Sequence, residues 1–596
     1  VVSVSVLDNK FIESFAKNTF GITNPLYLEQ IVKVSKGNPR VAYLLCSIAV
    51  KENKLNSIRD ASEMMDDTYA NSVRLIEENN QDGLLFKTAG IIGIFGPVRL
   101  DKPENLSGIF HIAGITFDQF KEGCKKLNDI EEIDYPKEQV AMFSDQCLAT
   151  YILKKTLFDD CEIPLLPFLG KEFGIYREKI VSALNNGFSP YEKPEYHAFL
   201  KDRVSEAWEE LERANAPISQ EFIEAFGIMF PEKTIFLLAD YAAAMPKPFL
   251  LVPETDFKYE QPSIFPLKIC SQLIKIGKAK PAVQILESII TRYPEIHNQV
   301  IGSVIDGFSL TYEDVVNGFG VQRKGLADIS GLPFSEAMQL LLGKLLEYLL
   351  KFDFEENSFE GRDFQIRQFF LPSNENALAF RNECWDFLAK MEAPIQSQVV
   401  LSFAKEYPNQ AKGLYENDVR HVEQIVPQIG TSLYCSIIKR EISKVIKISK
   451  LDIHMTMATK DSDDSFLSSL EPQRHSDDWR KEDSEWMSFL GRQYETLGKE
   501  DFISLVSKCK EYLSYFPSNS YQLLEILFTA FQGAASLEES VERIDLISNC
   551  LSSSRIIWRE PSRYLLSKYS ANKVFESFQR IGDPRAKERV TFDYFG

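Results

Sequence analysis

Residues that could perform catalysis do not form any of the common catalytic motifs in this chain. Its Gly-Lys pairs lack the following Ser or Thr and the Gly-rich lead-in of a phosphate-binding loop. They lie at 170–171, 277–278, 343–344 and 498–499. The six histidines include no pair four residues apart, so no metal site is predicted. The adjacent carboxylates Glu131 and Glu132 are assigned to an exposed strand. These residues do not predict an enzyme.

The segment from Gly37 to Arg40, Gly-Asn-Pro-Arg, is the sharpest local motif. It has a purely structural interpretation. Gly37 can follow the end of a helix that begins at Asn24-Pro25, because a left-handed conformation costs glycine nothing. Pro39 then fits the first turn of the next helix, where its missing N–H is no loss. The motif therefore predicts a helix boundary at the least.

The elements between 81 and 160 have a recognisable order. We expect helices at about 84–94 and 103–110, and a third helix whose start is capped by Thr116. Two short strands follow, at 130–135 and 138–143, and then a closing helix from Asp145 to Leu157. Three helices, a β-wing and a closing helix predict a winged-helix domain.

Residues 8–50 and nearly everything after 166 show helical periodicity. Aromatic-Pro pairs such as Tyr293-Pro294 end several of the later helices, as in arrays of helical hairpins. The clearest hairpin spans 266–294, with a turn at Gly277-Lys278. We expect a linker at 252–266 and a mobile acidic loop near 458–485. A buried strand is expected at 1–7.

This arrangement, a helical block with Gly-x-Pro followed by a winged helix, resembles the STAND-type AAA+ ATPases. That family includes the NB-ARC and NACHT sensors and the prokaryotic antiviral AVAST proteins. The run from Ile31 to Ala42 is most similar to the bacterial branch. The resemblance implies that Gly37, Pro39 and Arg40 contribute to a nucleotide site, with Pro39 touching adenine and Arg40 approaching the phosphates. The proline ring already fixes φ, so Pro39 would lose little conformational entropy when a purine packs against it.

The resemblance also bears on the junction between the wing and the closing helix. Related sensors have Met-His-Asp there, and the His meets the β-phosphate of ADP. Met142 and Asp145 fit this pattern, but Phe143 and Ser144 stand where the His is expected. Asp145 is therefore a candidate nucleotide contact without its usual neighbour. The alternative is that Ser144 or Asp145 only caps the closing helix.

The fold class expected is mainly α: AAA+ lid helices, a winged helix and a TPR-like α-solenoid. The domains expected are the end of an ATPase module at 1–60, the winged helix at 61–165, a helical linker block at 166–260 and a helical sensor at 261–596. The chain is treated as the C-terminal part of a longer ATPase that binds ATP or ADP with Mg mostly through upstream residues.

By the same resemblance, the solenoid recognises a viral (phage) protein, and the protein forms a homo-oligomer that activates an effector. Two alternatives remain open. One is a STAND-type transcriptional regulator, and the other is a helical protein-interaction scaffold that binds no nucleotide. Nucleotide bound at Pro39 in a longer protein would separate the scaffold from the other two.

Residues 352–370 contain six phenylalanines among acidic residues and arginines. The favoured interpretation is an insertion whose aromatic side chains are buried in the solenoid. The alternative is a protruding element that binds a partner, since interfaces favour aromatic residues and Arg. In that case Arg362, Phe364 and Arg367 are the candidate contacts.

Length and composition limit the number of domains and the kinds of partner. The 596 residues suggest about four domains. The net charge of −19 opposes binding to nucleic acid. The third helix of the expected winged helix is neutral, and its wing is acidic. The nine cysteines are dispersed without a CxxC pair, as in reducing compartments. The longest apolar run, 89–98, is too short to cross a membrane. We expect a cytoplasmic protein without membrane or nucleic-acid partners.

Overall fold

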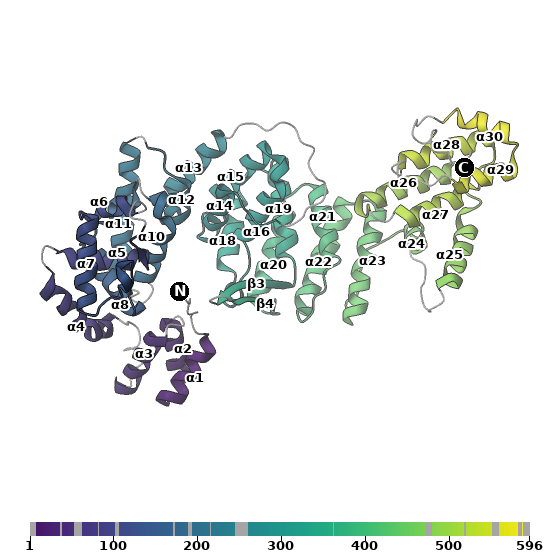
Figure 1. The fold of residues 1–596 in the computed structure, drawn as a ribbon. Helices are drawn as coiled ribbons and strands as arrows, with labels where there is room; N and C mark the ends of the chain where they lie inside the picture. Colours follow the sequence, from purple (N-terminus) through teal and green to yellow (C-terminus); the bar gives the residue numbers. More distant parts are fainter. Residues whose placement is uncertain are drawn as a thin grey trace. The chain divides into compact units, whose positions relative to one another are not determined.

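The computed structural model describes residues 8–35, 39–52, 62–80, 83–101, 106–170, 173–188, 194–214, 216–244, 260–360, 363–470, 479–517, 520–550, 559–581 and 587. Most of them lie in helices, and the strands form two sheets of two strands each (Figure 1). The expected mainly α class is confirmed. No helix in the described ranges combines the length and the apolar character needed to span a bilayer. The strand expected at 1–7 lies outside the described residues.

The chain divides into two compact units, one of 1–307 with 355–367 and one of 308–354 with 368–596. The elements of the first unit are α1 (Asn9–Phe20), α2 (Pro25–Ser35), α3 (Pro39–Glu52), α4 (Ser62–Asn79), α5 (Leu84–Phe95), β1 (Val98–Arg99), α6 (Ser107–Ala113), α7 (Phe117–Asp129), η4 (Pro136–Glu138), β2 (Val140–Ala141), α8 (Gln146–Lys154), the π-turn η5 (Lys155–Asp159), α9 (Leu165–Leu169), α10 (Phe173–Phe188), α11 (Pro194–Arg213), α12 (Gln220–Phe226), η6 (Gly227–Met229), α13 (Pro231–Ala244), α14 (Phe265–Lys275), α15 (Ala279–Arg292), η7 (Pro294–Ile296) and α16 (His297–Gly307).

Helices α1 to α3 pack against one another. Asp8 caps α1 by accepting a hydrogen bond from the Phe11 N–H, and Asn24 accepts one from the Leu26 N–H at the start of α2. Helix α3 begins at Pro39, so the expected helix start at this proline is confirmed. Gly37 itself lies outside the described residues.

Helices α5, α7 and α8 share a core, and α5 contacts both others. Gly123 on α7 allows the close approach, because a Cβ there would collide with Thr88 of α5. Thr116 and Gln119 form a capping box at the start of α7, which confirms the expected cap. Helix α8 ends at Lys154 and continues as a π-turn to Asp159, two residues past the expected end.

The strands next to these helices differ from the prediction. The two wing strands expected at 130–135 and 138–143 are reduced to β2 and one antiparallel bridge, Asp134 to Met142, on either side of η4. Strand β2 pairs with β1, Val98 opposite Ala141, and β1 was not predicted. A strand of two residues is too short to show the alternation on which strand prediction depends.

The assignment of Glu131 and Glu132 to an exposed strand is wrong. Glu131 has φ 63°, a left-handed conformation outside any strand. Glu132 is 7% exposed. The backbone N–H of Glu132 donates to the Leu127 carbonyl at the end of α7, and this turn places the Glu132 side chain in the interior.

The hairpin of α14 and α15 is confirmed. Gly277 between them has φ 80°, a conformation that glycine adopts without strain. The apolar residues that helical periodicity places in the core of this hairpin are buried, except Ile276, which follows α14 and is 44% exposed; the buried ones are Leu267, Ile269, Leu273, Ala282, Val283, Leu286, Ile289 and Ile290.

The second unit contains α17 (Tyr312–Val316), α18 (Gly320–Ile329), α19 (Glu336–Leu349), the ends of β3 (Asp353–Glu360) and β4 (Asp363–Phe370), α20 (Glu375–Leu388), α21 (Ala393–Phe403), α22 (Lys412–Ile429), α23 (Ser432–Ser449), α24 (Asp461–Ser469), α25 (Trp479–Tyr494), α26 (Lys499–Tyr515), α27 (Ser520–Phe531), α28 (Leu537–Cys550), α29 (Arg559–Lys568) and α30 (Ala571–Phe578). Residues 355–367 of β3 and β4 are grouped with the first unit.

The β3–β4 hairpin is an exception to the helical pattern that was expected of nearly everything after residue 166. Its phenylalanines explain how it is held. Phe352, Phe354 and Phe369 are buried, whereas Phe370 is 38% exposed. The expected burial of aromatic side chains is therefore confirmed for the base of the hairpin.

The expected acidic loop near 458–485 is also wrong over much of its length. Helix α24 occupies 461–469, and its first turn carries Asp461, Asp463 and Asp464, where carboxylates stabilise the helix dipole. Asp463 is buried and forms an ion pair with Lys508 of α26, at 2.6 Å. Residues 471–478 lie outside the described part.

A buried arginine anchors the hairpin base within the second unit. Arg381 is fully buried and donates to the carbonyls of Leu350 and Lys351, both at 2.9 Å, at the end of α19. It also pairs with buried Asp418 at 2.6 Å, and Asp418 accepts the Trp385 indole N–H at 2.7 Å. The arginine thus satisfies carbonyls that a helix end leaves free.

Candidate functional site

The seam between α4 and α8 is the densest group of interacting polar side chains around a predicted site residue. Asp145 stands at its centre as the N-cap of α8. Its Oδ1 accepts the backbone N–H of Cys147 at 2.9 Å. Its Oδ2 accepts the hydroxyl of Tyr69, which lies on α4, also at 2.9 Å. The capping role expected of Ser144 or Asp145 therefore belongs to Asp145.

A second bond crosses the seam in the opposite direction. Tyr151 of α8 donates its hydroxyl to Asp66 of α4 at 2.7 Å. The rings of Tyr69 and Tyr151 lie beside each other, with centroids 5.6 Å apart. Each helix thus supplies one tyrosine donor to a carboxylate across the seam. Burial, together with the neighbouring Asp66, raises the pKa of Tyr151, so its hydroxyl stays a donor.

A buried lysine closes one end of the seam. Lys154 is 3% exposed and lies 3.5 Å from Asp66 and 3.3 Å from Asp159. Its ammonium also lies 5.3 Å from the centroid of the Tyr151 ring. Two carboxylates and an aromatic face offset the cost of burying this charge.

Glu132 lies close to the same seam. Burial raises the pKa of its carboxyl, a hydrogen bond to Ser72 of α4 opposes that shift, and the charge of Asp145 adds to it. The seam therefore joins α4 to helices α5–α8 through interactions of ionisable side chains.

The polar groups of the seam interact with one another. Its carboxylates are occupied by tyrosine hydroxyls, a lysine and a backbone N–H. Among the residues described, no group of His, Cys, Asp and Glu could hold a metal ion. Hydrogen bonds of this kind can break and re-form, so a movement of α4 would change the hydrogen bonding at the start of α8.

The other predicted site residues are less fully described. Pro39 is exposed at the start of α3. Gly37 and Arg362 lie outside the described residues, as do the side chains of Arg40 and Phe364. Arg367 is exposed on β4. The structure therefore gives side-chain geometry for Asp145, and the place of the Gly37–Arg40 motif in a nucleotide site stays a prediction.

The sequence did not point to Tyr69, Tyr151, Asp66 or Lys154. Their interactions join positions far apart in the chain, for example 85 residues for Tyr151 and Asp66. Local periodicity carries no signal for such pairs. Only Asp145 was found, as a candidate nucleotide contact through the resemblance and, in the alternative interpretation, as a cap of the closing helix.

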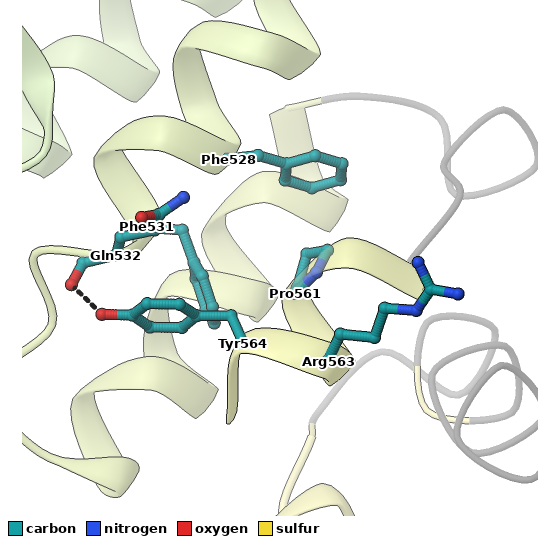
Figure 2. Close-up of a pocket in the computed structure, with 6 residues that line it drawn as sticks. All are labelled: Phe528, Phe531, Gln532, Pro561, Arg563 and Tyr564. Atoms are coloured by element: carbon teal, nitrogen blue, oxygen red, sulfur yellow. Dashed lines mark hydrogen bonds between the residues drawn. The ribbon is translucent and has the colours of Figure 1, made fainter. Parts of the chain in front are cut away.

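Hollows in the described part of the chain also lie away from the seam. One of about 550 Å³ lies between α1 and α2 and is lined by Asn9, Glu13, Lys17, Thr23, Pro25, Leu28, Glu29 and Val32. Another, of about 300 Å³, lies between α27 and α29 (Figure 2). There Phe531 and Tyr564 present their rings, and the Tyr564 hydroxyl donates to the Gln532 carbonyl at 2.6 Å. The described residues that line the second hollow are three aromatic residues with a glutamine, a proline and an arginine, and they include no acid–base pair.

Comparison of the chain with protein-family models, curated proteins and solved structures gives no match. Support for a function therefore comes from the residues themselves and from the resemblance to the STAND-type ATPases.

Proposed function

We propose that α5 to α8 form a winged-helix domain and that the chain is the regulatory and sensor part of a bacterial STAND-type ATPase. The observation that carries the proposal is the order of elements from Leu84 to Met142. Helix α5, strand β1, helices α6 and α7, an extended segment at Asp134 and strand β2 follow one another. The segment 140–142 pairs with β1 and, through Met142, with Asp134. This is the order of a three-stranded winged helix.

The charges of α7 favour a regulatory winged helix over one that binds DNA. Each of its lysines is paired with a carboxylate. The pairs are Lys121 with Asp118 at 3.4 Å, Lys125 with Glu138 at 3.1 Å and Lys126 with Glu122 at 2.8 Å. Phosphate contacts need free cationic groups. This argues against the alternative of a transcriptional regulator.

In this proposal the α4–α8 seam transmits the nucleotide state. ATP or ADP with Mg is bound mainly by residues preceding this chain, with Gly37, Pro39 and Arg40 contributing from the lid. Both oxygens of Asp145 already accept hydrogen bonds. A nucleotide contact that drew Asp145 away from Tyr69 would break the hydrogen bond between them and loosen α4.

The helices from α14 onward serve as the TPR-like recognition array in this proposal. Paired helices such as α14 and α15 create extended surfaces suited to a protein ligand. The net charge of −19 favours basic or neutral protein surfaces. The resemblance supplies the class of ligand, a phage protein, and the response, oligomerisation that activates an effector. A helical scaffold without nucleotide remains the second candidate.

The test uses the full-length protein in bacteria challenged with a panel of phages. Deleting 260–596 is expected to abolish protection while nucleotide binding persists. The matched control removes the Tyr69 hydroxyl (Tyr69→Phe), which leaves the array intact and changes only the threshold of the response. Protection that survives the deletion would contradict the sensor role. A full-length protein that binds no nucleotide would favour the scaffold.

A further inference from the structure

The β3–β4 hairpin has a register that its described residues define. The Leu371 N–H donates to the Phe352 carbonyl at 3.0 Å, and only 361–362 separate the two strands. Counting from that bond places Phe354 opposite Phe369, whose rings stack with centroids 5.9 Å apart. The next pair on the same face is Glu356 opposite Arg367.

This register determines which backbone groups face the open edge of β3. In an antiparallel pair, alternate residues exchange hydrogen bonds with the partner strand, and the residues between them point their N–H and C=O groups away from it. Because Phe352 bonds to Leu371, the outward groups on β3 belong to Asp353 and Glu355. In the described part of the chain, no third strand pairs with this sheet.

The base of the hairpin, Phe352 to Phe354 with Phe369, is packed against the interior. Phe352 and Phe354 are buried, and the Arg381 guanidinium lies 4.1 Å from the centroid of the Phe352 ring. Tyr348 of α19 packs edge-on against Phe354, at 5.4 Å. A strand held in this way can accept another strand without first becoming ordered, which lowers the entropic cost of binding.

The negative charge of β3 favours a positively charged pairing strand. Its sequence contains four acidic residues, 353, 355, 356 and 360, and no basic residue. Asp353 and Glu355, which offer the outward backbone groups, are both acidic, and Glu355 is exposed. Charged side chains on an edge strand oppose pairing with a second copy of the same strand. A basic strand would instead gain favourable cross-strand pairs.

We propose that the outer edge of β3 binds an extended, basic segment of a partner protein by strand addition. The inference rests on the proposed function, since it gives the protein ligand a place to bind. Backbone hydrogen bonds to Asp353 and Glu355 supply affinity, and the acidic side chains supply the preference for Lys and Arg.

The test uses the whole chain and a synthetic peptide of alternating lysine and valine, eight residues long to match β3. Glu355→Pro removes an outward N–H without breaking a bond inside the hairpin. Gln368→Pro is the matched control, because residue 368 offers its N–H to the opposite edge, that of β4. Affinity is measured by fluorescence anisotropy, and amide exchange over 353–360 locates the bound peptide.

We expect Glu355→Pro to weaken binding at least tenfold and Gln368→Pro to leave it unchanged. The peptide should protect the outward amides of β3 from exchange. A second variant with Asp353→Lys and Glu355→Lys should prefer the alternating glutamate–valine peptide. Equal binding by both proline variants would mean charge attraction alone and would overturn the proposal, as would protection confined to β4.

This experiment needs neither nucleotide nor phage. Its failure would remove the β3 site while leaving the sensor role to be judged by the deletion of 260–596. Failure of that deletion experiment, with peptide binding intact, would remove the sensor role instead.

Discussion

Tyr69 and Asp145 are 76 residues apart in the sequence, yet the Tyr69 hydroxyl donates to the Asp145 carboxylate at 2.9 Å. The same carboxylate caps α8. One side chain therefore serves both the local start of a helix and a long-range attachment of α4. A substitution at Asp145 changes both attachments together, whereas a substitution at Tyr69 changes only the long-range one.

Removing the Asp145 carboxylate should destabilise the fold more than removing the Tyr69 hydroxyl that donates to it. Asp145→Ala loses the cap and leaves Tyr69 without its acceptor, and each loss is worth about 1 kcal/mol of unfolding free energy. Tyr69→Phe loses only the second, about 1 kcal/mol. Urea unfolding of the two variants and of the double variant measures this. Strict additivity of the two substitutions would contradict a direct bond.

Glu132 should make the protein less stable as pH rises. Burial raises the pKa of its carboxyl in the folded state. A raised pKa means that its favourable contribution is complete below the ordinary glutamate pKa and is lost as pH rises through the folded value. We expect Glu132→Gln to be more stable than the native chain at neutral pH and equal to it in acid. Thermal unfolding across pH measures this, and a stability gap that does not change with pH would show that the carboxyl does not titrate as described.

Arg381 and Asp418 should tolerate joint replacement better than single replacement. Arg381→Met leaves a buried carboxylate without its partner and is expected to cost about 3–5 kcal/mol. Adding Asp418→Leu removes that unpaired charge and should recover part of the loss. Urea unfolding of the single and double variants provides the comparison. A double variant less stable than both single variants would contradict the assignment of a buried ion pair.

Duplex DNA should not bind at about 0.15 M salt, because the lysines of α7 are paired with acids. The triple variant Asp118→Asn, Glu122→Gln, Glu138→Gln frees all three lysines and is expected to acquire salt-sensitive DNA binding. A gel-shift titration measures both proteins. Binding by the unmodified chain that weakens when Lys125 is removed would return the transcriptional regulator to consideration.

Sequence patterns predicted the local features well. The cap at Thr116 and the start of α3 at Pro39 depend on residues within one turn of each other, and the α14–α15 hairpin depends on helical periodicity on either side of the turn at 277–278; all three are present. The β3–β4 hairpin was missed because acidic residues dilute the alternation of its phenylalanines. Helix α24 was missed because its aspartates resemble a solvated loop, although Asp463 is paired with Lys508.

The candidate site was predicted only at Asp145. Tyr69, Tyr151 and Glu132 reach the seam through tertiary packing, which leaves no periodic trace in the sequence. The place of Gly37 and Arg40 in a nucleotide site remains a prediction from the resemblance.

In the proposed function, the α4–α8 seam responds to nucleotide. Amide hydrogen exchange of the full-length protein tests it most directly, with ADP and with a non-hydrolysable ATP analogue compared under the same conditions. We predict strong protection of α4 and the start of α8 with ADP and faster exchange there with the ATP analogue. Tyr69→Phe should exchange quickly in both states. Identical exchange of the seam in the two nucleotide states, in a protein shown to bind both nucleotides, would contradict this claim.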